Sequence, residues 1–133
     1  MNRNLTPQLT LQRLATIIKQ AVWSQGNRAL TGTLKGRYVK GRVFASGACI
    51  SMTLAWPLQQ ASRACLLLAA TTEACDDALY IEQEQLWLLR RYPVALTEVE
   101  LDLLLQQQLT LAELLVPPAK NVLPSPPSFG RFA

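Results

Sequence analysis

The stretch between Arg28 and Trp56 contains three short runs of alternating apolar and polar residues, and this pattern limits the possible folds most strongly. A period of two predicts strands with one buried face, here over residues 28–34, 39–45 and 48–56. Lys35-Gly36-Arg37 and Gly47 separate the runs, and glycine suits a tight turn because positive φ costs it no steric strain. In the third run, the alternation predicts that Ile50, Met52 and Leu54 lie on one face of the strand. Cys49, Ser51 and Thr53 then lie on the other face.

The segment before these strands has its apolar residues at helical intervals. Apolar residues recur at helical intervals from Leu11 to Val22, after a capping Thr6-Pro7 or Thr10, and they predict an amphipathic helix that ends near Gln25. Gly26-Asn27 is a natural stop, since glycine fits the left-handed position after a helix.

The second half of the chain predicts a helix, a hairpin and a final helix. Pro57 fits a first helical position and opens a helix over residues 58–72. Two strands, 78–82 and 86–92, form a hairpin that Pro93 ends. Thr97 and Glu100 form a capping box for a last helix, which we expect to break or bend near Leu109, where a second capping pattern begins.

Together these elements predict an α+β fold in the order α-β-β-β-α-β-β-α, with a mostly antiparallel sheet and the helices on one side. We expect a single domain over residues 1–116. Residues 117–133 contain five prolines, which no helix or central strand tolerates. This segment is a flexible tail or a docking peptide with Phe129 and Phe132 as anchors.

The middle helix is unusually apolar. Its segment Ala64 to Ala70 has no polar side, so one face serves the domain's own core and another needs a cover. The cover is either the rest of a monomer or a second subunit, and we predict the subunit. The expected interface is Ala61, Cys65, Leu68 and Thr72.

Composition excludes much catalytic chemistry. The chain has no histidine, its three cysteines form no C-x-x-C pair or zinc pattern, and its glycines form no phosphate loop. Only carboxylates or a lone thiol remain as catalytic groups, so we predict no enzyme, no metal and no cofactor. The first residues lack the apolar stretch of a secretory signal, which predicts residence in the cytoplasm.

The charge is unevenly distributed along the chain. Residues 1–63 carry nine basic and no acidic side chains, whereas the remainder carries nine acidic and four basic ones, so the two parts bear +9 and −5. Either the fold mixes the two parts, or a basic face remains that meets an acidic protein or nucleic acid. A candidate basic patch for nucleic acid is Lys35, Arg37, Lys40 and Arg42, with Tyr38 as a stacking platform.

The order of elements resembles the class I chaperones of bacterial type III secretion. A closer resemblance, to the SpiC/SepD family, lies in Thr33-Leu34-Lys35-Gly36, Gly41-Arg42-Val43-Phe44 and Ile50-Ser51-Met52-Thr53-Leu54. It continues into Cys65-Leu66-Leu67-Leu68-Ala69-Ala70 and Trp87-Leu88, and covers about residues 18–115.

This resemblance implies a non-enzymatic subunit of a type III secretion gatekeeper complex in the bacterial cytoplasm. Its partners would be a second small chaperone-like subunit and the gatekeeper, in a hetero-oligomer that sets the order of translocator and effector export. It could associate with the secretion apparatus at the inner membrane face, and export into a host is left open. No nucleic acid is expected in this role. The residues expected to hold a partner segment are Leu14, Ile17, Ile18 and Trp23.

Overall fold

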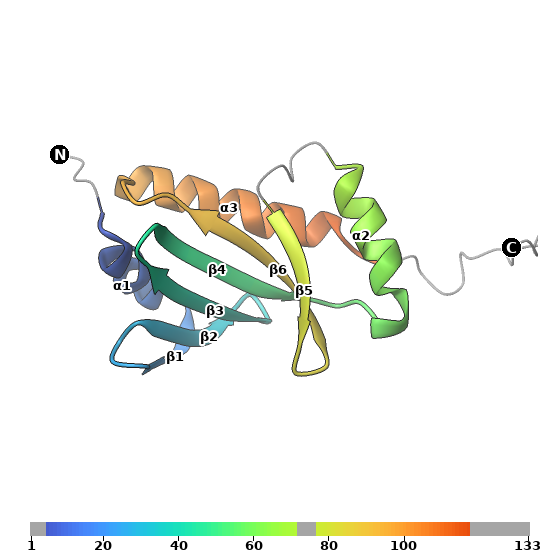
Figure 1. Cartoon of the computed structure of the whole chain (residues 1–133), viewed down its shortest axis with the longest axis horizontal. Coiled ribbons are helices and arrows are strands. Elements are labelled where there is room, and N and C mark those ends of the chain that lie inside the picture. The colour runs from blue at the N-terminus through green and yellow to red at the C-terminus, as the bar shows by residue number, and fades with distance from the viewer. Residues whose placement is uncertain (1–4, 72–76, 118–133) are drawn as a thin grey trace, which may run out of the picture.

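The computed structural model describes residues 5–71 and 77–117, which form an α+β fold with a six-stranded antiparallel sheet and three α-helices (Figure 1). The elements are α1 (Pro7–Ile17), β1 (Lys19–Ser24), β2 (Ala29–Leu34), β3 (Arg37–Phe44), β4 (Gly47–Leu54), η1 (Leu58–Gln60), α2 (Ala61–Ala69), β5 (Asp77–Glu82), β6 (Gln85–Tyr92) and α3 (Glu98–Leu114). The strand order is β1-β2-β3-β4-β6-β5, and every neighbouring pair is antiparallel. The expected α+β class and antiparallel sheet are therefore confirmed.

One face of the sheet carries the hydrophobic core. α1 packs against β2, β3 and β4, and α3 packs against β6. Along β4, Ile50, Met52 and Leu54 are buried in the core beneath these helices, as the alternation predicted. Figure 1 shows α1 and α2 at opposite ends of the long axis, with α3 running between them. In the described chain no helix packs on the other face of the sheet, which we call the open face.

The first helix is shorter than the sequence predicted. It ends at Ile17, and Lys19–Ser24 form the edge strand β1, so Trp23 lies on a strand and not on the helix. Gly26 and Asn27 form the β1–β2 turn, both at positive φ, instead of ending a helix. Lys19–Ser24 form a strand because they pair with β2. If they were helical, the N–H and C=O groups on one edge of β2 would lose their hydrogen-bond partners. Gly32 makes room for the crossing chain, since a Cβ there would lie 2.6 Å from Ile18 Cδ1 and 2.7 Å from the Lys19 carbonyl oxygen.

The second half follows the sequence pattern closely. The helix after Pro57 forms as the short η1 followed by α2, and the β5–β6 hairpin forms as expected. Both hydrogen bonds of the Thr97–Glu100 capping box are present. α3 is continuous from Glu98 to Leu114, so it does not break near Leu109. The Pro-rich segment from residue 118 lies outside the described residues, and so do Phe129 and Phe132.

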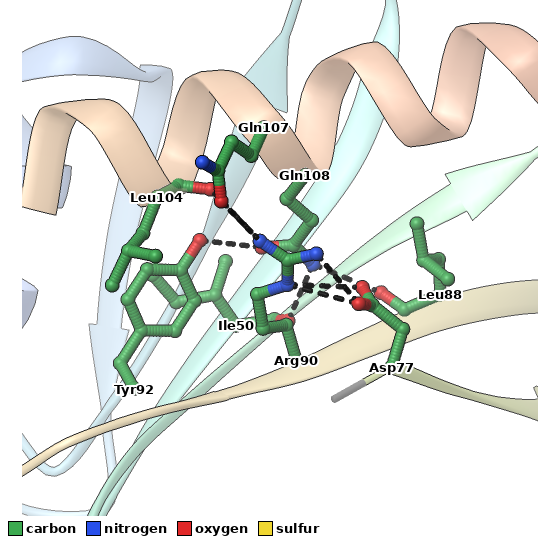
Figure 2. A network of polar contacts seen from close by, with 8 residues as sticks. All are labelled: Ile50, Asp77, Leu88, Arg90, Tyr92, Leu104, Gln107 and Gln108. Carbon is green, nitrogen blue, oxygen red and sulfur yellow. Dashed lines mark hydrogen bonds and ion pairs between the residues drawn. The ribbon is translucent and has the colours of Figure 1, made fainter. Parts of the chain in front are cut away.

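A buried polar network joins the sheet to α3 (Figure 2). Arg90 of β6, on the helix-covered face, donates to both carboxylate oxygens of Asp77 on β5, at 2.6 to 3.1 Å. Beside it, the Tyr92 hydroxyl donates to Gln108 Oε1 at 2.6 Å, and Gln108 Nε2 donates to the carbonyls of Ile50 and Leu88. Burial raises the pKa of the Tyr92 hydroxyl, so it remains a donor. The network fixes the register of β5, β6 and α3 from inside the protein.

Candidate functional site

α2 presents most of its apolar side chains to solvent. Ala64 is its only fully buried residue, while Leu66 is 72% exposed and Leu67 is 38% exposed. Cys65, Ala69 and Ala70 are exposed beside them. We call these five residues, Cys65, Leu66, Leu67, Ala69 and Ala70, the α2 surface. An apolar helix side of this kind, uncovered by the described chain, is typical of a protein-interaction surface.

The predicted subunit interface lies partly on this surface and partly inside the domain. Ala61 and Leu68 pack against the core beside Ala64, and Cys65 is exposed. Thr72 lies outside the described residues. Leu66 and Leu67, which the sequence analysis did not single out, are the most exposed leucines of the helix.

A sequence signal for the outward side of α2 does exist. Leu66 lies four residues after Ser62 and three after Arg63, and residues at these spacings share a helix face. The polar pair therefore marks the outward side. The leucine run alone does not show which side of the helix faces solvent, because Leu66, Leu67 and Leu68 are equally apolar.

The residues expected to hold a partner segment do not form one exposed stripe. Leu14 and Ile18 lie in the core, 1% and 7% exposed. Ile17 and Trp23 are half-buried against the same core, Trp23 from β1. The amphipathic pattern of this segment therefore reflects packing on the domain's own sheet.

The four cations of the predicted basic patch are also divided by the fold. Arg37 points toward the helix-covered side, where its guanidinium donates to the carbonyls of Thr53 at 2.9 Å and Ala112 at 3.4 Å. Lys35 lies in the exposed β2–β3 turn, and strand alternation places Lys40 and Arg42 on the open face. The cluster thus offers no continuous track for a phosphate backbone.

The open face is organised around Lys40. Its Nζ lies 2.6 Å from Glu82 Oε1 and 4.1 Å from the centre of the Trp87 ring. Tyr80 stacks on Trp87 with ring centres 6.2 Å apart. Two hollows, of about 610 and 380 Å³, adjoin this cluster and share Thr31, Lys40 and Glu82 in their walls. The first is lined by Gln20 of β1 and by Gln83 of the β5–β6 turn, so the open face is concave across the sheet.

Two arginines flank a cysteine on the same face. In the ladder, Arg42 of β3 pairs with Cys49 of β4, and Cys49 pairs with Arg91 of β6. Burial raises the pKa of the Cys49 thiol, although the charges of Arg91 and Arg42 act to lower it. A raised pKa keeps the thiol protonated at neutral pH, which makes it a poor nucleophile. This part of the face therefore presents two exposed guanidinium groups on either side of a protonated thiol.

Within residues 5–71 and 77–117, no group of three or more cysteine, aspartate or glutamate side chains is placed to hold a metal ion. None of the helices in these ranges combines the length and apolarity needed to cross a bilayer. The arrangement of the described residues is that of two binding surfaces, the α2 surface and the open face.

Comparison of the chain with protein-family models, with curated proteins and with solved structures gives no match.

Proposed function

We propose that this chain is a non-enzymatic, chaperone-like subunit of a type III secretion gatekeeper complex. In this role it binds a second small chaperone-like subunit and the gatekeeper, and so controls the order of translocator and effector export. The work takes place in the bacterial cytoplasm, at or near the inner membrane face of the secretion apparatus. The α+β fold and the strand motifs that resemble the SpiC/SepD family agree with this function.

The observation that carries the proposal is the α2 surface. Leu66 remains largely exposed and Leu67 partly exposed in the folded chain, although a leucine side chain gains about 1.5–3 kcal/mol when it is fully buried. A stable interface needs about 800 Å² from each partner, more than two leucines provide. The α2 surface is therefore one part of a larger contact, to which other parts of the chain contribute the remaining area.

Substitution of Leu66 tests this function. The chain is co-expressed with the products of neighbouring reading frames, and the complexes are isolated by size exclusion and their masses determined. Leu66→Asp should abolish co-purification with the second subunit, because a carboxylate buried in an apolar contact loses its hydration without compensation. Since Leu66 is exposed, the variant should keep the thermal stability of the isolated wild-type chain.

Gln12→Asp is the matched control. It adds the same charge at an exposed position of α1, at the opposite end of the molecule from α2 (Figure 1). This control should co-purify like wild type. Equal recovery of the partner with Leu66→Asp, or a wild-type chain that stays monomeric and binds no neighbouring product, would contradict the proposed function.

A further inference from the structure

The open face carries positive charge that the described chain does not neutralise. Arg42 and Arg91 are both exposed, and neither forms an ion pair with a carboxylate of residues 5–71 or 77–117. Arg42 contacts only the Phe44 ring, at 5.6 Å, and the Gln25 side-chain oxygen, at 3.4 Å. The strand spacing places the two arginine backbones about 10 Å apart, on either side of Cys49.

The acidic groups of the described chain lie elsewhere. Among the strand residues that point to the open face, Glu82 is the one carboxylate within the described ranges, and Lys40 is bonded to it. Four acidic residues lie on α3, across the sheet, namely Glu98, Glu100, Asp102 and Glu113. Ion pairs such as Arg13–Asp102 join basic residues of the first part of the chain to acidic residues of the second part. On the open face, Arg42 and Arg91 form no such pair with the described residues.

Arg42 lines the smaller hollow, and the larger hollow, which meets it at Thr31, Lys40 and Glu82, suits a polypeptide backbone. Its walls carry the amides of Gln20, Gln83 and Gln85 and the hydroxyls of Thr31 and Thr33. Such groups both donate and accept hydrogen bonds, as the N–H and C=O groups of an extended peptide require. Guanidinium groups in turn pair with carboxylates in a two-pronged geometry.

We propose that the open face is a second binding surface, which holds an extended acidic segment of a partner protein. The carboxylates of that segment pair with Arg42 and Arg91, and its backbone follows the two joined hollows past Lys40. This surface is separate from the α2 surface and does not depend on the function proposed for α2.

The chemistry of the face favours a peptide over nucleic acid. Trp87 is 2% exposed beneath Lys40, so its ring is not free to stack on a base. The Glu82 carboxylate lies in the wall of both hollows and would repel a continuous chain of phosphates. A peptide with spaced carboxylates avoids this repulsion.

Fluorescence anisotropy with short labelled probes tests the proposal. The probes are a peptide of alternating glutamate and serine, its glutamine counterpart, and a thymidine oligonucleotide of the same length. The wild-type chain should bind the glutamate peptide and not the glutamine peptide. Arg42→Gln/Arg91→Gln should weaken binding by about tenfold or more, because two charge-assisted contacts are lost.

Lys35→Gln/Arg63→Gln is the matched control, since it removes the same charge from exposed positions outside the open face. It should bind the glutamate peptide like wild type, and so should Leu66→Asp. Equal binding by the two double variants would overturn the proposal. Tighter binding of the oligonucleotide, or self-association of the chain that the Arg42→Gln/Arg91→Gln change abolishes, would replace the acidic peptide with a different occupant and would also overturn it.

Discussion

Asp77→Ala is expected to lower the free energy of unfolding by about 3–5 kcal/mol, because it breaks a buried ion pair by removing the carboxylate that accepts three hydrogen bonds from the Arg90 guanidinium. The Asp77 side chain is 0% exposed and that of Arg90 is 7% exposed. The Arg90 guanidinium also donates to the Leu104 carbonyl at 3.5 Å and to Gln107 Oε1 at 3.3 Å, and both of these acceptors are neutral. Urea denaturation followed by circular dichroism measures the loss.

Two comparisons make this result specific to the buried charge. Asp102→Ala removes a carboxylate from the exposed Arg13–Asp102 pair and should cost much less stability. Adding Arg90→Met to Asp77→Ala should recover part of the loss, because a buried pair replaced by apolar groups is often neutral in stability. Similar losses for Asp77→Ala and Asp102→Ala would show that the buried pair has no special role.

Gly47→Ala is expected to destabilise the fold by about 3 kcal/mol or more. Gly47 opens β4 at φ +138°, a conformation that side-chain-bearing residues rarely adopt. An added Cβ would also overlap the carbonyl oxygen of Tyr92 on β6, which is backbone and cannot move aside. The strain therefore falls on the central β4–β6 pair.

Gly36→Ala is the control for Gly47. Gly36 also has positive φ, +80°, but nothing lies within 4 Å of its added Cβ. Only the backbone preference is lost there, so we expect a cost of about 1–2 kcal/mol. Thermal and urea unfolding of both variants separate the two effects. Equal destabilisation would mean that the close approach to Tyr92 contributes nothing.

The residues of the candidate interface on α2 were harder to predict from the sequence than the fold. The apolar excess of α2 was visible in the sequence, and the structure confirms that most of this helix is exposed. The choice of Ala61 and Leu68 as interface residues followed helical spacing, but these two face the core. Spacing within the apolar run does not tell which side turns outward; that side is marked by the polar Ser62 and Arg63 one turn before Leu66.

The open face shows the same limit more clearly. Lys40 and Glu82 are 42 residues apart, and only the curl of the sheet brings them together. The Arg42–Cys49–Arg91 row likewise needs the strand order β3-β4-β6, which joins distant parts of the chain. Spacing in sequence grouped Lys35, Arg37, Lys40 and Arg42, whereas strand alternation separates Arg37 from the rest.

Local chemistry was sufficient for the strands from β2 to β6 and for the start of α3. Alternation, turn glycines and the Thr97–Glu100 capping box act within a few residues, so they can be read directly along the chain. The strand conformation of Lys19–Ser24 and the partners of each charge could be known only from the folded protein. Each of these depends on contacts between residues far apart in sequence, where an unpaired strand edge, a neighbouring core or an opposite charge outweighs local preference.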